Sequence, residues 1–199
     1  MFLLHGTLVT SASDLKKASD CEFAFLRELD VKLGRDTLFE PVGDAMLERA
    51  GALGTEHELR VLARYRERFG DGVVEIEQPS VRDAEAVAAA VARTHDALLA
   101  GTPVVYQATF ATDGFIGFAD FIVRRPDGRY RVQDSKLARH ARVTALLQLA
   151  AYAEQLTRLG IPVDDTVELL LGDGTSSEHR LDDIMPVYRQ RVARLRQIV

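Results

Sequence analysis

The stretch IGFADFIVRRPDGRYRVQDSKLA, residues 116–138, predicts a β-hairpin that carries charged residues where its core should be. Residues 116–125 and 129–137 are rich in β-branched and aromatic side chains. Between them, Pro126-Asp127-Gly128 suits a type I turn that closes on a left-handed glycine. The prediction of the candidate site starts from this hairpin.

The register of the hairpin brings two acidic residues together. With a three-residue loop, Arg125 opposes Arg129, and counting back places Asp120 opposite Asp134 on a largely apolar face. Their Cβ atoms then lie roughly 5 Å apart, so the pair needs a compensating cation, either Lys136 or a divalent metal. A two-residue loop would instead move Asp120 to the opposite face and leave Asp134 and Lys136 as an ordinary surface pair.

Composition describes a globular chain with enough hydrophobic residues for a core. The 199 residues are 47% hydrophobic, which suits one domain over 1–199, with a helical N-terminal part (1–70), an α/β core (71–182) and a C-terminal helix (183–199). The chain has no basic leader and no apolar run of roughly 18 residues, so we expect a cytoplasmic protein without a membrane partner. The abrupt final helix leads us to expect the N-terminal part of a longer protein.

Charge is distributed unevenly along the chain. The net charge of −5 argues against a nonspecific nucleic-acid coat protein. Residues 124–142 are nevertheless strongly basic and contain only Asp127 and Asp134 as acids, and residues 189–196 form a second basic cluster. Basic charge around an acidic pair suits a polyanion held beside a metal. The alternative is a solvated, arginine-rich surface.

The hydrophobic patterns predict a mixed central sheet flanked by helices. The predicted helices are 13–21 with Ser13 as N-cap, 21–33, 43–69, 81–99, 143–159 and 184–199, and the predicted strands outside the hairpin are 73–78, 104–110, 166–172 and 178–181.

The segment Asp134-Ser135-Lys136 has the composition of a compact catalytic unit. Phosphodiester hydrolysis uses a metal to activate water, and Mg²⁺ prefers carboxylate, carbonyl and water oxygens. Asp120 and Asp134 can provide carboxylates. The Ser135 side chain is expected to point away while its backbone carbonyl could face the metal, and Lys136 can orient water or neutralise developing charge.

Three polar residues on predicted helices are further candidates. Gln148 and Tyr152 stand at i and i+4 on one face and could cover the active site. Alternatively, Gln148 is exposed and the Tyr152 ring packs with its hydroxyl in water. His57 is either a satisfied core residue or a ligand, and Glu58 points about 100° away from it.

These motifs resemble, in their order, the PD-(D/E)XK nucleases of the RecB type: His57 in G-x-x-H-E, Asp120, Asp134-Ser135-Lys136 and Gln148-x-x-x-Tyr152. That group includes nuclease domains of recombination helicase-nucleases and CRISPR adaptation nucleases. The resemblance spans residues 10–180 and implies a restriction-endonuclease-like core. It also implies that Mg²⁺ or Mn²⁺ is held by His57, Asp120, Asp134 and the Ser135 carbonyl, that Lys136 assists the attacking water, and that Gln148 and Tyr152 form a supporting motif.

A second similarity concerns Cys21, the only cysteine. One cysteine alone excludes an internal disulfide framework and a cysteine-rich zinc site made by this chain. Iron–sulfur members of the group have one cysteine in such an N-terminal segment and three after the last core element. Cys21 matches the first position and nothing downstream matches the others. We expect a [4Fe-4S] cluster only in a longer native protein.

The expected function is a metal-dependent DNA nuclease, a single-strand exonuclease acting on free ends in repair or recombination, with a helicase module in the same polypeptide or complex. One alternative is a catalytically inactive DNA-binding scaffold, although a degenerate copy should have lost one of Asp120, Asp134 and Lys136. Another is a hydrolase for a small phosphorylated substrate, which requires a closed pocket instead of a groove lined by arginines.

Overall fold

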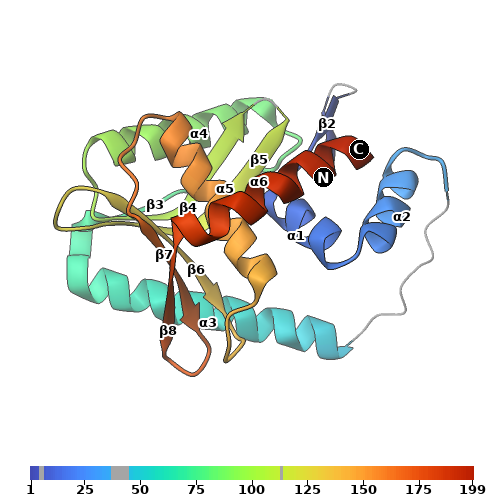
Figure 1. Cartoon of the computed structure of the whole chain (residues 1–199). Coiled ribbons are helices and arrows are strands. Elements are labelled where there is room, and N and C mark those ends of the chain that lie inside the picture. The colour runs from blue at the N-terminus through green and yellow to red at the C-terminus, as the bar shows by residue number, and fades with distance from the viewer. Residues whose placement is uncertain (5–6, 37–44, 113) are drawn as a thin grey trace.

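A mixed six-stranded sheet forms the centre of the computed structural model, which describes residues 1–4, 7–36, 45–112 and 114–199 (Figure 1). In spatial order the strands are β3 (Val73–Glu75), β4 (Val104–Thr112), β5 (Phe115–Arg124), β6 (Tyr130–Lys136), β7 (Thr166–Leu171) and β8 (Ser176–Arg180). The pairs β3–β4 and β6–β7 are parallel and the others are antiparallel. The predicted mixed sheet flanked by helices is therefore confirmed.

Helices cover both faces of this sheet. They are α1 (Ala12–Asp20), α2 (Glu22–Lys32), α3 (Ala45–Phe69), α4 (Ala84–Leu99), α5 (Val143–Arg158) and α6 (Leu181–Ile198). Figure 1 shows α3 beneath the sheet and α4, α5 and α6 above it. None of the helices in the described ranges is long and apolar enough to cross a bilayer.

The first residues differ from the prediction of a purely helical N-terminal part. β1 (Phe2–Leu4) and β2 (Thr7–Val9) form a short antiparallel pair outside the main sheet. Thr10 then bridges to Phe115 at the start of β5, which connects this segment to the sheet. Such short strands leave too little periodicity in the sequence for detection.

The hairpin register is as predicted. Arg124 pairs with Tyr130 and Phe121 pairs with Gln133, so the next step places Asp120 opposite Asp134. Gly128 has φ +87°, the left-handed conformation that the three-residue loop requires.

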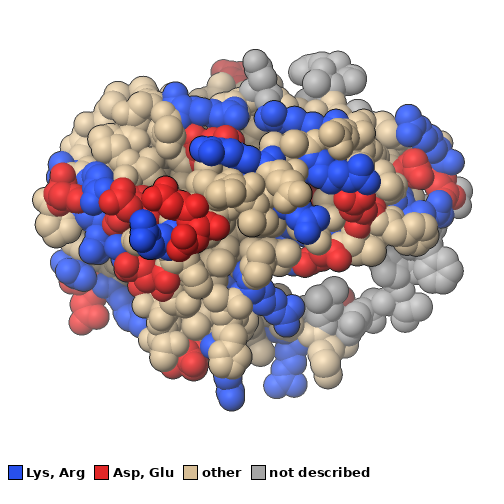
Figure 2. Space-filling model, viewed as in Figure 1, with Lys and Arg blue, Asp and Glu red and all other residues tan. Residues whose placement is uncertain are grey.

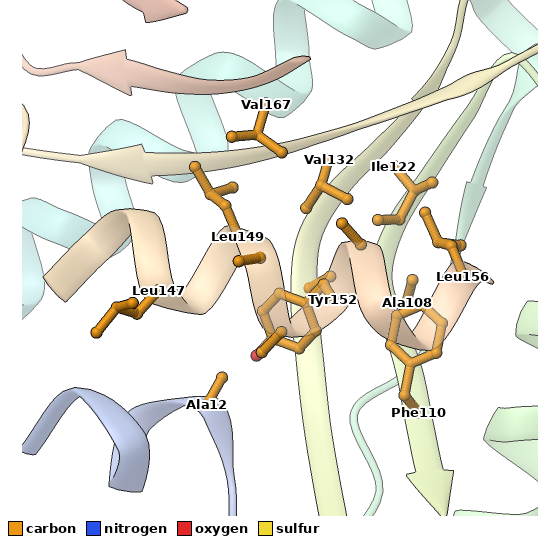
Figure 3. Packing of buried hydrophobic residues seen from close by; sticks show 14 of the residues in the cluster. Ala12, Ala108, Phe110, Ile122, Val132, Leu147, Leu149, Tyr152, Leu156 and Val167 are labelled. Atoms are coloured by element: carbon orange, nitrogen blue, oxygen red, sulfur yellow. The ribbon is translucent and has the colours of Figure 1, made fainter. Parts of the chain in front are cut away.

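The core has two parts because the sheet is buried on both faces. On one face α5 packs Leu149, Tyr152 and Leu156 towards Ile122 and Val132 (Figure 3). On the other face Val61 and Leu62 of α3 pack with Phe121 and Val104. Each such aliphatic or aromatic side chain contributes about 1.5–3 kcal/mol when fully buried. The sheet is therefore held between α5 on one face and α3 on the other.

Several helix starts differ from the prediction: α4 begins at Ala84 instead of residue 81, and α6 begins at Leu181 instead of residue 184. The N-cap of α1 is Ser11 instead of Ser13, because Ser11 and Asp14 form a reciprocal capping box. The sequence offers serine at both positions, but only Ser11 has an acidic residue three positions later.

Candidate active site

The acidic pair lies where β5 and β6 stop pairing, with β7 running parallel beside β6. Ser135 donates two hydrogen bonds to Asp120 Oδ2, from its backbone N–H at 2.9 Å and from Oγ at 3.1 Å. The prediction that the Ser135 side chain points away is therefore wrong. Beyond Phe121 and Gln133 the strands no longer form a regular ladder, so the Asp120 carboxylate can reach the freed Ser135 N–H.

Asp134 is almost fully buried and pairs with Lys136. The Asp134 side chain is 6% exposed, whereas the Lys136 side chain is 33% exposed. Lys136 Nζ donates to Asp134 Oδ1 at 2.8 Å and lies 2.6 Å from Oδ2. Although Oδ2 is this close to the ammonium group, it accepts no hydrogen bond of good geometry within the described ranges. The Lys136 ammonium group therefore lies against both Asp134 oxygens but forms a well-aligned hydrogen bond with only one of them.

The electrostatics of the pair follow from burial and proximity. Burial raises the pKa of Asp134 to about 8; the nearby Asp120 carboxyl adds to this, and Lys136 opposes it. Burial alone would lower the pKa of Lys136, but Asp134, Asp120 and Glu58 together raise it. Lys136 is therefore a firmly protonated cation among carboxylates, and it only partly compensates their charge.

Glu58 joins the site from α3, which the sequence argument missed. Its Oε1 accepts hydrogen bonds from Tyr106 Oη at 2.9 Å and from Gln107 Nε2 at 2.5 Å. Burial and the charge of Asp120 raise the pKa of Glu58, and these two hydrogen bonds and Lys136 oppose the shift. The available signal was helical spacing, because Glu58 lies four and seven residues before Leu62 and Tyr65, which face the sheet.

His57 lies on α3 against the neighbouring strand β7. Its ring is buried, and Nε2 lies 3.1 Å from the backbone carbonyl oxygen of Leu170 in β7. The described contacts of His57 do not include Asp120 or Asp134. Its role as a metal ligand stays a prediction, while Glu58 is the residue of this motif that interacts electrostatically with Asp120.

Tyr152 is buried beneath the acidic pair. Its ring centroid is 6.0 Å from that of Phe110, and burial followed by the charges of Asp120 and Asp134 raises the pKa of its hydroxyl. The alternative of a hydroxyl in bulk water is excluded, because only 6% of Tyr152 is exposed. Gly117 makes room for this ring, since a Cβ there would lie 2.8 Å from it.

Gln148 and Cys21 lie nearer the N-terminal helices. Gln148 is half-buried, with Nε2 3.5 Å from Ser13 Oγ and with a buried Oε1 that has no partner in the described part of the chain. Cys21 is exposed and accepts a hydrogen bond from Ala24 N at 3.5 Å as the N-cap of α2. The predicted roles of both residues stay predictions.

The predicted basic surface is divided by the hairpin. Arg125 and Arg129 lie at the turn end, about 16 Å along the strand from Asp134 for five residues, and Arg131 lies about 10 Å from it for three residues. There they pair with acids distant in sequence: Arg125 with Asp164 at 3.3 Å, Arg129 with Asp165 at 2.7 Å, and Arg131 with Asp164 at 2.9 Å and Glu178 at 2.5 Å. Figure 2 likewise shows both charge signs intermixed over the visible face. This part of the predicted polyanion surface is neutralised.

Lys136, His140 and Arg142 border a pocket together with Lys16. The pocket has a volume of about 200 Å³ and is lined by Lys16, Lys136, Leu137, Ala138, His140, Arg142, Thr144, Ala145 and Leu169. Arg142 precedes α5 without using its side chain to cap the helix. Lys16 is 2.7 Å from Asp20, so its charge is partly compensated. The pocket combines an apolar floor with a basic rim.

The donor set fits a hard divalent cation. Asp120 and Asp134 provide carboxylate oxygens, one of them buried without a hydrogen bond, and Mg²⁺ is commonly held by one or two carboxylates with waters completing its shell. Among the described residues, no group of three or more His, Cys, Asp and Glu side chains is already gathered for a metal. The site is thus a two-carboxylate centre with Glu58 close by.

Comparison with known proteins agrees with this geometry. No curated protein matches the chain. The sequence model of the PD-(D/E)XK nuclease superfamily matches residues 9–197. The mixed sheet between helices, with an acidic pair and a lysine at the end of the central hairpin, is consistent with the restriction-endonuclease-like fold of that group. The chain therefore belongs to the PD-(D/E)XK nuclease superfamily.

Proposed function

We propose that this chain is a metal-dependent deoxyribonuclease of the RecB type that hydrolyses phosphodiester bonds. The observation that carries the proposal is the buried carboxyl group of Asp134. It lies close enough to Asp120 for that charge to raise its pKa, and its Oδ2 is 2.6 Å from Lys136 Nζ. Two carboxylates in such contact are unfavourable in a structural core and favourable around a cation. Superfamily membership supports the same conclusion.

Asp120, Asp134 and the Ser135 carbonyl would hold the Mg²⁺ or Mn²⁺. When bound, the ion supplies charge stabilisation at the phosphoryl oxygens and acidifies water. Lys136 remains protonated and neutralises charge that develops on the phosphate in the transition state. Ser135 fixes the Asp120 carboxylate through two hydrogen bonds, so that this ligand is oriented before substrate arrives.

The basic-rimmed pocket beside Lys136 supports a nucleic-acid substrate. Arg142 and His140 line the same pocket as Lys136, which pairs with Asp134, and Arg142 also acts electrostatically on Asp20. A strand whose scissile phosphate sits at Asp134 could place a neighbouring phosphate at Arg142. A preference for single-stranded ends, a role in repair or recombination, a cytoplasmic location and a helicase partner are proposed from the resemblance alone.

A catalytically inactive DNA-binding scaffold is the second candidate. It is favoured by one observation, that the described acidic side chains are not gathered into a group of three that is ready for a metal. Against it, Asp120, Asp134 and Lys136 are all present and in contact.

Cleavage of end-labelled single- and double-stranded DNA with Mn²⁺, Mg²⁺ or EDTA tests the proposal. Wild type should cut only with metal, and Asp134→Ala and Lys136→Ala should not cut, while Asp127→Asn at the turn should retain activity. Metal-independent cutting, or cutting by Asp134→Ala, would contradict the assignment. DNA binding without any cleavage would favour the scaffold.

A further inference from the structure

Gln107 has an unusual backbone conformation at a position opposite Asp120. Among the described residues it is the one residue other than glycine with positive φ, at +55°. Tyr106 pairs with Phe121 and Ala108 pairs with Ala119, so Gln107 lies opposite Asp120, where the regular ladder is interrupted. A residue with a Cβ pays a free-energy penalty for this conformation, and such strain persists where the surrounding structure enforces it.

The left-handed conformation changes the direction in which the Gln107 side chain points. Successive residues of a regular strand point to opposite faces of the sheet. Tyr106 points to the α3 face, where its ring centroid lies 5.2 Å from that of Phe121. Gln107 would then point away from α3, yet its Nε2 also donates to Glu58 on α3. The left-handed backbone is what brings two consecutive side chains to one carboxylate.

The two hydrogen bonds occupy only one of the two carboxylate oxygens of Glu58. Both Tyr106 Oη and Gln107 Nε2 donate to Oε1. No protein partner is found for Oε2 within residues 1–4, 7–36, 45–112 and 114–199. Asp120 and Lys136 are the charged groups that act on Glu58. Glu58 is thus fixed through one oxygen, and its charge interacts with those of Asp120 and Lys136.

We propose that Gln107 and Tyr106 are positioning residues that hold Glu58 near the acidic pair, so that it becomes a third carboxylate once a cation is bound at Asp120 and Asp134. Without the ion, the described acidic side chains are not gathered into such a group. The strained backbone at Gln107 directs its side-chain amide towards Glu58. This inference rests on the proposed metal-dependent function. It assigns no contact with the cation to Gln107 or Tyr106 themselves.

Mn²⁺ affinity without DNA tests the proposal, measured from the paramagnetic resonance of unbound Mn²⁺. Gln107→Met keeps the size and the strain but loses the donor, so affinity should fall about 10- to 100-fold, as for other residues that orient metal ligands. Glu58→Gln should lose at least as much. The double variant should lose no more than Glu58→Gln alone, because Gln107 acts through Glu58.

Gln107→Gly separates positioning from stability. Glycine adopts positive φ without penalty, so its melting temperature in EDTA should be no lower than that of Gln107→Met, while its Mn²⁺ affinity should be equally weak. Gln155→Met, which removes a buried side-chain amide on α5, is the control and should keep wild-type Mn²⁺ affinity. A purely structural role for Gln107 predicts instead that affinity recovers with stability in the glycine variant.

Asp134→Asn distinguishes failure of this inference from failure of the proposed function. If Asp134→Asn loses Mn²⁺ binding while Gln107→Met and Gln107→Gly bind as wild type does, the metal site stands and the positioning role is overturned. If Asp134→Asn also binds Mn²⁺ normally, the metal site itself is wrong, and the positioning role fails with it.

Discussion

Replacing Asp134 by asparagine should stabilise the metal-free protein, and increasingly so as pH rises from 5 to 7. Burial, reinforced by Asp120 and opposed by Lys136, raises the pKa of Asp134 from 3.8 to about 8. The folded chain therefore keeps a proton that the unfolded chain releases. This group's contribution to folding is fully present below pH 3.8 and is lost progressively up to about pH 8.

The magnitude follows from linkage. Between the two pKa values, wild type loses about 1.4 kcal/mol of unfolding free energy per pH unit through this group. Asparagine does not titrate, so the difference in stability between variant and wild type should grow by about 2–3 kcal/mol from pH 5 to pH 7. The asparagine side chain still fills the same space beside Lys136 and Asp120.

Urea denaturation in EDTA at pH 5, 6 and 7 measures this difference. Asp127→Asn is the matched control, because Asp127 is exposed and its pKa is lowered by Arg129, so it does not titrate in this range. A gap between Asp134→Asn and wild type that stays constant across these pH values would refute the reasoning, since it would mean that Asp134 is ionised in the folded protein.

Three further predictions concern the lysine, the basic pocket and the packing of Tyr152. Lys136→Ala should reduce single-turnover cleavage at least about 100-fold while DNA binding in EDTA persists, because the transition-state charge loses its cation; unchanged cleavage would remove Lys136 from the mechanism. Arg142→Ala should weaken single-stranded DNA binding, and the slope of log affinity against log salt should fall by about 1 in fluorescence anisotropy, whereas Arg129→Ala at the turn should leave both unchanged. Gly117→Ala should lower the melting temperature, since a Cβ 2.8 Å from the Tyr152 ring overpacks the core by about 1–3 kcal/mol; a wild-type melting temperature would show that the ring has room to move.

The register of the central hairpin could be predicted from sequence because its determinants are local. The Pro126-Asp127-Gly128 loop fixes which residues oppose each other, and the alternation of side chains carries that register to Asp120 and Asp134. The pairing of Lys136 with Asp134 followed from the same two-residue period.

Contacts between distant segments could not be predicted in this way. Three arginines looked unpaired because their partners, Asp164, Asp165 and Glu178, come from other strands and loops; they are Arg125, Arg129 and Arg131. The side-chain direction of Ser135 depended on where two strands stop pairing, which alternation within one strand does not encode.

The sequence by itself determined the mixed sheet between helices and the acidic pair with its lysine, because hydrophobic period, turn chemistry and residue spacing act over a few neighbouring positions. Only the tertiary structure decided that Glu58 interacts with Asp120, that the adjacent His57 contacts the Leu170 carbonyl, and that Gln107 reaches Glu58. The physical reason is that these outcomes depend on how α3 is rotated against the sheet and on one left-handed residue in β4. Both are set by packing between layers that are far apart in sequence.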